Sequence, residues 1–136
     1  MPLAKDNTPL PLACCGFGSP ALDFAEPPLS LDDVTCLRQP STFLMRAVGD
    51  SMTGLGIYPG DVLVIDKART PGDGDIVVAV VGEGFLVKQL RLVPTPSLHS
   101  ANAAYPPLVI GEDNPLEVWG VCTWNLHALL GKCGVS

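Results

Sequence analysis

A serine and a lysine 37 positions apart (88 − 51) have the sequence surroundings that most favour chemistry. Ser51 lies in residues 49–54 (Gly-Asp-Ser-Met-Thr-Gly), where flanking glycines predict a chain reversal that leaves its hydroxyl accessible. Lys88 lies in residues 85–90 (Phe-Leu-Val-Lys-Gln-Leu), which have the pattern of a β-strand. Because alternate side chains of a strand share a face, Lys88 is in phase with three leucines, Leu86, Leu90 and Leu92.

Burial among these leucines would allow Lys88 to act as a base. Burial disfavours the charged amine, so a lysine pKa falls from about 10.4, in extreme cases to about 5–6. A neutral amine beside a serine hydroxyl can remove its proton and activate it as a nucleophile. We therefore predict a Ser51/Lys88 dyad. The same alternation also fits a lysine that lies along an apolar face and extends its ammonium into water.

The Gly-Asp-Ser sequence also occurs in serine hydrolases of the Gly-Asp-Ser-Leu esterase type. Those enzymes need a histidine preceded three residues earlier by aspartate, but His99 and His127 are preceded at that distance by Pro96 and Trp124. They are also α/β proteins, and this sequence lacks alternating β and α segments. A G-x-S-x-G nucleophile elbow is absent as well. The sequence therefore disfavours a histidine-dependent hydrolase.

Composition narrows the class of protein. With 136 residues, 47% of them hydrophobic, the chain is one domain, or a smaller domain with an arm. It has no apolar run of membrane-spanning length and no secretory signal, so we expect a cytoplasmic location. The net charge of −6 argues against direct binding to nucleic acid. The five cysteines form no C-x-x-C pair, so we expect reduced thiols and no metal site.

The chain changes character near residue 40. Residues 1–40 are rich in proline and predict an extended or poorly ordered arm, with one helical turn over residues 29–37 that begins at Ser30. Residues 41–136 predict a mainly β domain in which Gly82-Glu83-Gly84 forms the three-residue loop of a hairpin. The expected strands are residues 42–48, 62–65, 76–81, 85–93, 108–110 and a long strand or pair of strands over 116–130.

Several motifs in this order resemble the self-cleaving peptidase family of LexA and UmuD. They are Ser51-Met52, residues 56–61 (Gly-Ile-Tyr-Pro-Gly-Asp), residues 74–79 (Gly-Asp-Ile-Val-Val-Ala) and residues 85–90. In the arm, Cys15-Gly16 resembles the Cys-Gly self-cleavage site of UmuD-type proteins. Only a short acidic arm precedes the β region, whereas LexA carries a DNA-binding domain there. The chain therefore resembles the UmuD branch of the family.

The resemblance implies a LexA/signal-peptidase-like β domain in a cytoplasmic homodimer of the SOS response. Ser51 and Lys88 would be catalytic, and the backbone N–H groups of Ser51 and Met52 would be the oxyanion donors. RecA on single-stranded DNA would promote cleavage between Cys15 and Gly16. The shortened product would join a Y-family, UmuC-like polymerase subunit in error-prone translesion synthesis. The resemblance implies no metal, no cofactor, no sequence-specific DNA binding and no membrane partner.

One alternative remains open from the sequence. The chain could be a catalytically silent, β-rich protein-interaction module in which Ser51 and Lys88 are incidental. Signal peptidases share the serine–lysine chemistry, but they need a membrane anchor, and the sequence contains none. We expect Asp50 and Asp61, the acidic neighbours of the serine segment, to form caps or turns rather than to take part in catalysis.

Overall fold

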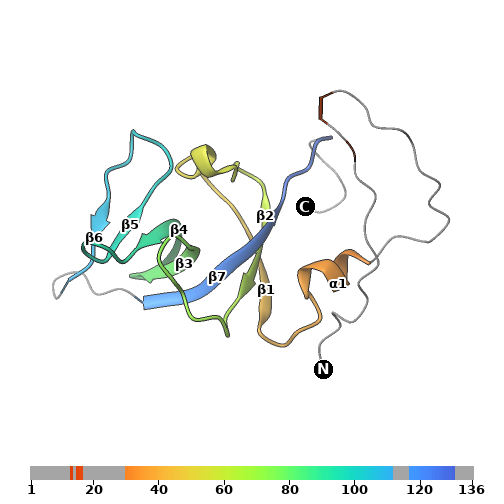
Figure 1. The fold of residues 1–136 in the computed structure, drawn as a ribbon, viewed down its shortest axis with the longest axis horizontal. Coiled ribbons are helices and arrows are strands. Elements are labelled where there is room, and N and C mark those ends of the chain that lie inside the picture. Colours follow the sequence, from red (N-terminus) through yellow and green to blue (C-terminus); the bar gives the residue numbers. More distant parts are fainter. Residues whose placement is uncertain (1–12, 14, 17–29, 112–116, 131–136) are drawn as a thin grey trace. The chain divides into compact units, whose positions relative to one another are not determined.

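The computed structural model describes residues 13, 15–16, 30–111 and 117–130 (Figure 1). The chain divides into two units, Met1–Arg38 and Gln39–Ser136, and each is described by itself. In the first unit, helix α1 (Leu31–Thr35) begins after Ser30, whose Oγ accepts a 3.2 Å hydrogen bond from the backbone N–H of Asp32. It ends at Cys36, which has the left-handed conformation common at helix ends. The helical turn predicted to begin at Ser30 is confirmed.

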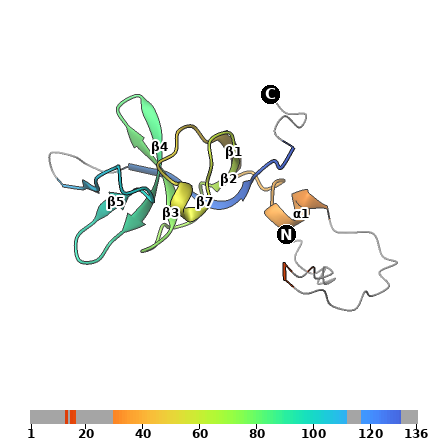
Figure 2. The same cartoon turned by 90° about the horizontal axis from the view of Figure 1, so that it is seen from above.

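The described residues of the second unit form seven antiparallel strands in one sheet, which confirms the mainly β fold. The sheet order is β1-β2-β7-β3-β4-β5-β6, so β7 pairs with β2 on one side and with β3 on the other. Figures 1 and 2 show β7 passing through the middle of this unit. The strands are β1 (Thr42–Arg46), β2 (Val62–Asp66), β3 (Ile76–Val81), β4 (Gly84–Arg91), β5 (Ser97–His99), β6 (Leu108–Val109) and β7 (Glu117–Leu126).

The hairpin between β3 and β4 differs from the sequence prediction. Val81 pairs with Gly84, so the loop consists of Gly82 and Glu83 alone, and the predicted three-residue loop is wrong. Gly82 has a φ of 59°, which suits the positive φ that two-residue hairpin turns require. Strand β5 was not predicted, because its three residues follow a proline-rich stretch that hides the strand pattern.

Two apolar clusters lie on opposite faces of the sheet, because adjacent residues of a strand point to opposite sides. Val77 belongs to one cluster and Val78 to the other. The first cluster packs under the segment that carries Ser51 and contains Ala47, Met52, Ile57, Leu63, Ile65 and Val78. The second supports β4 and β5 and contains Val77, Ala79, Leu90, Leu98 and Val121.

The sheet is strongly curved. The ring of Trp119 on β7 packs edge-on against Phe43 of β1 and against Phe85 of β4, with centroid distances of 5.3 and 5.5 Å. Three strands separate β1 from β4 in the sheet order. The sheet must therefore bend until β1 and β4 flank the same ring. This curvature brings the segment that follows β1 towards β4.

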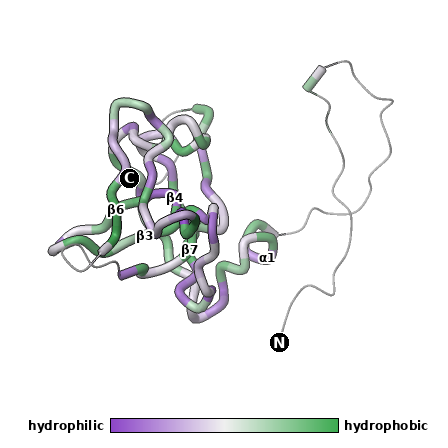
Figure 3. Tube along the Cα trace, turned by 60° about the vertical axis from the view of Figure 1, so that its left-hand side comes forward, coloured by the Kyte–Doolittle hydropathy of each residue, from purple (hydrophilic) through white to green (hydrophobic). Residues whose placement is uncertain are grey.

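Hydrophobic residues also reach the surface at one edge of the sheet. Strand β6 is coloured as hydrophobic in Figure 3, and both of its residues are exposed. Within the described ranges, we find no helix with the length and apolar character needed to cross a membrane.

Candidate active site

Ser51 lies in the connection between β1 and β2, which turns sharply around the 3₁₀ helix η1 (Thr53–Leu55). Gly49 and Gly56 flank this turn with φ values of 85° and 86°, a conformation that favours glycine. The Ser51 carbonyl accepts a 2.7 Å hydrogen bond from the N–H of Ala101. The glycine-flanked reversal predicted around Ser51 is therefore present, and a second segment of the chain holds it in place.

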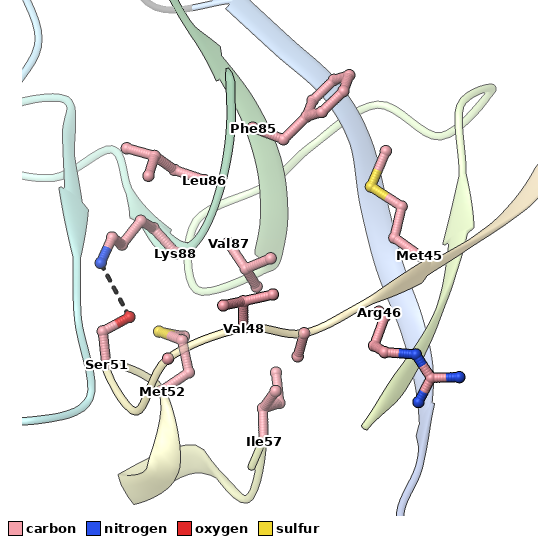
Figure 4. A pocket seen from close by; sticks show the side chains of 12 residues that line it. Met45, Arg46, Val48, Ser51, Met52, Ile57, Phe85, Leu86, Val87 and Lys88 are labelled. Atoms are coloured by element: carbon pink, nitrogen blue, oxygen red, sulfur yellow. Dashed lines mark hydrogen bonds between the residues drawn. The ribbon is translucent and has the colours of Figure 1, made fainter. Parts of the chain in front are cut away.

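Lys88 lies on β4, opposite Val77 of β3. Its Nζ donates a 3.0 Å hydrogen bond to Ser51 Oγ (Figure 4) and a 2.8 Å hydrogen bond to Ser100 Oγ. The lysine is partly buried, and this burial lowers the pKa of Lys88 below its ordinary value. The fold thus brings together the two residues that the sequence singled out 37 positions apart.

The surroundings of Lys88 differ from the expected row of leucines. Leu90 is buried, but Leu92 lies beyond the end of β4 and is 40% exposed. The Nζ interacts with the two serine hydroxyls and with the ring of Tyr105, whose centroid is 5.4 Å away. Polar and aromatic groups from other segments therefore define the environment of the amine.

The sequence prediction did not include Ser100. No motif surrounds this residue, and only the pairing of two strands places it near the lysine. Gln89 of β4 pairs with His99 of β5, so the next antiparallel positions outward are Lys88 and Ser100. Recognition of the short strand β5 would have revealed Ser100 through this register.

A cavity of about 160 Å³ extends from the Ser51–Lys88 pair between β1 and β4. Figure 4 shows Ser51 and Lys88 at one end, with Phe85 and Met45 further along. The lining is mostly apolar, with Arg46 at the β1 side, where its guanidinium donates to the Gly60 carbonyl at 2.9 Å. The arrangement offers an apolar pocket beside one nucleophile and one amine.

The two backbone groups predicted as oxyanion donors have no acceptor among the described residues. Within the part of the chain that the structure describes, the N–H groups of Ser51 and Met52 make no hydrogen bond. Donors that no protein group occupies are available to a negatively charged oxygen. Their assignment as oxyanion donors stays a prediction.

Asp61 joins the end of the serine segment to β7. Its carboxylate is 2% exposed and accepts hydrogen bonds from the Tyr58 N–H at 2.9 Å and from Asn125 Nδ2 at 2.8 Å. His127 Nδ1 lies 2.6 Å from the other carboxylate oxygen. Burial acts to raise the pKa of Asp61, but the hydrogen bonds from Tyr58, His127 and Asn125 outweigh it and hold the pKa below its usual value. Asp61 forms a turn, as expected, and it also clamps two elements together.

The residues proposed for cleavage belong to the first unit. Cys15 and Gly16 are both exposed, and Cys15 is a free thiol. Most of the predicted arm, including residues 1–12 and 17–29, lies outside the described residues. Burial raises the pKa of the Cys122 thiol on β7 to about 12, so this cysteine is not a nucleophile. Over the described ranges, we find no group of His, Cys, Asp and Glu side chains that could hold a metal ion.

Comparison with known proteins adds independent information. Residues 10–123 match the family described as Peptidase S24-like. Protein SamA of Salmonella typhimurium is 45% identical over 113 residues, which cover 82% of this chain and 78% of that protein. Protein MucA of Escherichia coli is 42% identical over 113 residues, covering 82% and 77%. The LexA repressor of Alcanivorax borkumensis is 38% identical over 77 residues, covering 56% of this chain and 38% of the repressor.

Proposed function

Because this chain belongs to the Peptidase S24-like family, we propose that it is a serine endopeptidase that cleaves its own chain between Cys15 and Gly16. Ser51 is the nucleophile and Lys88 is the general base. One distance above all supports this assignment, the 3.0 Å between Lys88 Nζ and Ser51 Oγ beside an apolar cavity. The lowered pKa of Lys88 increases the fraction of neutral amine that can accept a proton at neutral pH.

The reaction proceeds through an ester. Neutral Lys88 takes the Ser51 proton while Oγ attacks the carbonyl carbon of Cys15, and the N–H groups of Ser51 and Met52 stabilise the oxyanion. The Lys88 ammonium then returns the proton to the amine of Gly16, which leaves. A water molecule activated by Lys88 hydrolyses the ester, which frees Ser51 and leaves a carboxylate on Cys15. Throughout, Ser100 Oγ holds one N–H of the amine.

The scissile segment binds beside β4 in an extended conformation. Residues 84–88 of β4 pair only with β3 within the described chain, since pairing with β5 begins at Gln89. This leaves backbone groups along the cavity to which a peptide can add as a further strand. The 35 residues from Gly16 to Ser51 (51 − 16) span at most about 115 Å when extended. Cleavage within one chain and cleavage across a dimer are both within reach.

RecA on single-stranded DNA acts by selecting the docked arm. A peptidase whose substrate segment is seldom in the site is slow, and a partner that favours the docked pose raises the rate by shifting that population. RecA therefore needs to supply no catalytic group. The shortened protein, as a cytoplasmic homodimer, then joins a Y-family, UmuC-like polymerase subunit in SOS mutagenesis.

The proteolytic step is tested by incubating the purified full-length chain with RecA, ATP and single-stranded DNA and measuring intact mass. We expect two products whose masses place the break after Cys15. Ser51→Ala and Lys88→Ala each abolish the products, whereas Ser41→Ala and Lys67→Ala, outside the site, retain them. Cleavage by the Ser51→Ala chain would exclude Ser51 as the nucleophile. A wild-type chain that stays intact would favour a silent interaction module.

The partner is tested separately, because binding does not require the dyad once the arm has been removed. A chain that begins at Gly16 is expected to form dimers in light scattering and to co-purify with the UmuC-like subunit. The Ser51→Ala full-length chain, which keeps its arm, serves as the comparison. Equal recovery of both forms would show that cleavage does not control assembly with the polymerase.

A further inference from the structure

The loop between β5 and β6 holds the segment that carries Ser51. The backbone N–H of Ala101 donates to the Ser51 carbonyl at 2.7 Å, and the Ala101 carbonyl accepts from the Gly54 N–H at 3.0 Å. The side chain of Asn102 donates to the Asp50 carbonyl at 3.2 Å. These contacts fix the loop on the side of Lys88 where Ser100 lies. The last contact of this loop involves a tyrosine ring.

Tyr105 connects Asp50 to the amine of Lys88. Its hydroxyl donates a 2.8 Å hydrogen bond to Asp50 Oδ1, and its ring centroid lies 5.4 Å from Lys88 Nζ. The hydrogen bond to Asp50 raises the pKa of Tyr105, so the hydroxyl remains a neutral donor over the working range of pH. Tyr105 is 43% exposed, so the ring that lies beside the amine is also in contact with solvent.

The groups around Nζ match the hydrogen-bonding inventory of a neutral amine. A neutral amine has one lone pair and two N–H groups, whereas an ammonium has three N–H donors and no lone pair. In the neutral amine the direction of the 3.0 Å contact with Ser51 Oγ can reverse, so that the lone pair accepts the hydroxyl proton. One N–H donates to Ser100 Oγ, and the ring centroid of Tyr105 lies 5.4 Å from the nitrogen. An ammonium in the same place would have a third N–H to satisfy. The face of the Tyr105 ring would take the place of the water molecule that would otherwise accept it. Water is the stronger partner, because a hydrogen bond from a charged donor exceeds an exposed cation–π contact.

We propose that Tyr105 is a positioning residue for the base, in which the ring closes the solvent side of the Lys88 amine and the Asp50 carboxylate keeps the ring there. This inference deepens the proposed function, on which its catalytic consequence rests. In this role Tyr105 acts through Lys88 and not directly on the scissile bond or the nucleophile. Its effect is exerted through the protonation equilibrium of Lys88.

Other charged or titratable groups near Lys88 are engaged elsewhere. His99 of β5 binds Ser97 Oγ at 2.8 Å, and Arg46 across the cavity donates to the Gly60 carbonyl. Strand β3 carries no ionisable residue, and Arg91, further along β4, is exposed. Asp50 therefore supplies the charge that acts on the Lys88 amine from the side of the Tyr105 ring. It favours the ammonium, but its Oδ1 accepts the hydrogen bond from the Tyr105 hydroxyl.

The decisive experiment measures the pKa of Lys88 directly. The Ser51→Ala chain, which cannot cleave itself at alkaline pH, is labelled with ¹³Cε-lysine, and the Lys88 resonance is assigned by Lys88→Ala and titrated by NMR. Adding Tyr105→Ala is expected to raise the pKa of Lys88 by about one unit, on the order of a tenfold change in the equilibrium. Tyr105→Phe keeps the ring without its tether and is expected to give a value between the two, nearer the parent. Tyr58→Ala removes a tyrosine of similar exposure, 44%, whose ring packs against His127, and is expected to leave the Lys88 pKa unchanged.

Two results would overturn the proposal. One is a Lys88 pKa that is unchanged or lower in Tyr105→Ala, or in Tyr105→Leu should the alanine variant not fold. The other is a Tyr105→Phe value as high as that of Tyr105→Ala, because the ring would then give no shielding. In chains that retain Ser51, Tyr105→Ala is further expected to move the pH profile of self-cleavage to the alkaline side. A wild-type chain that never cleaves itself refutes the proposed function, whereas the NMR titration still decides the role of the ring.

Discussion

Gly54 is the position at which one added methyl group should most disturb the site. A Cβ built on Gly54 would lie 2.2 Å from the Ala101 carbonyl oxygen and 3.2 Å from its carbonyl carbon. Both obstructing atoms belong to backbone, so no side-chain rotation can relieve the overlap. In Gly54→Ala the serine segment and the β5–β6 loop must separate by about 1 Å to reach ordinary van der Waals contact.

The loss of folding stability follows from the hydrogen bonds that this movement breaks. The hydrogen bond from Gly54 N–H to Ala101, now 3.0 Å, and the one from Ala101 N–H to Ser51, now 2.7 Å, would both stretch beyond bonding range. At about 1 kcal/mol each, their loss destabilises the fold by roughly 2 kcal/mol. Ser100, next to Ala101, moves away from Lys88 together with the loop. A displacement of about 1 Å in a catalytic arrangement can lower the rate on the order of 100-fold.

Urea unfolding and the rate of self-cleavage at pH 10 without RecA measure the two effects. Gly111→Ala is the matched control, because no atom of the described residues lies within 4 Å of the Cβ position there and its φ is not in the left-handed region. That control should stay within about 0.5 kcal/mol of wild type and cleave at the same rate. A Gly54→Ala chain with wild-type stability and rate would show that the loop does not hold Ser51 in place.

Three further outcomes follow from the site. Self-cleavage without RecA should accelerate as pH rises and level off above the lowered pKa of Lys88, since the neutral amine is the reactive form; a rate that is flat from pH 7 to 10 would count against it. Ser100→Ala removes one acceptor for the amine and should slow cleavage about tenfold, with Ser100→Thr restoring most of the rate in the same time course. Asp61→Asn should destabilise the fold by about 3 kcal/mol near neutral pH in urea unfolding, since it replaces a buried carboxylate that accepts several hydrogen bonds. Because the folded pKa of Asp61 is lowered, wild type should lose this stability advantage as pH falls through that pKa, and the unfolding free energies of the two chains should then converge. A difference in unfolding free energy that stays constant down to about pH 2 would contradict the role of Asp61 as a clamp.

The structural features that the sequence predicted correctly are those that depend on local sequence patterns. Alternating apolar runs bounded by glycine and proline predicted most strands, and the glycines around Ser51 predicted the reversal. The serine caps of helices are also local, so Ser30 was identified correctly. The mainly β class followed from these short segments. The division into an arm of residues 1–40 and a domain of residues 41–136 stays a prediction.

What the sequence could not predict depends on pairings between distant strands. Ser100 joins the site only through the register of β4 with β5, and β5 is too short to show a pattern. Tyr105 reaches Lys88 because the loop before β6 crosses the serine segment, a contact that no spacing rule encodes. The alternating leucines predicted which side chains of β4 share a face, but they did not predict where the strand ends. Leu92 was therefore wrongly included on the face of Lys88. The catalytic roles of Ser51, Lys88 and Met52 stay predictions that the variants above will test.

The central place of β7 has a consequence for how the protein is made. Ser51 lies on the β1–β2 side of the sheet and Lys88 on the β3–β6 side, and β7 is the strand that joins the two sides. During translation residues 117–126 leave the ribosome long after both residues of the pair. A nascent chain in which β7 is still inside the exit tunnel already carries Ser51, Lys88 and the proposed cleavage site, but it lacks the strand that joins the two sides of the sheet. The self-cleavage proposed above therefore has to wait until β7 has left the ribosome.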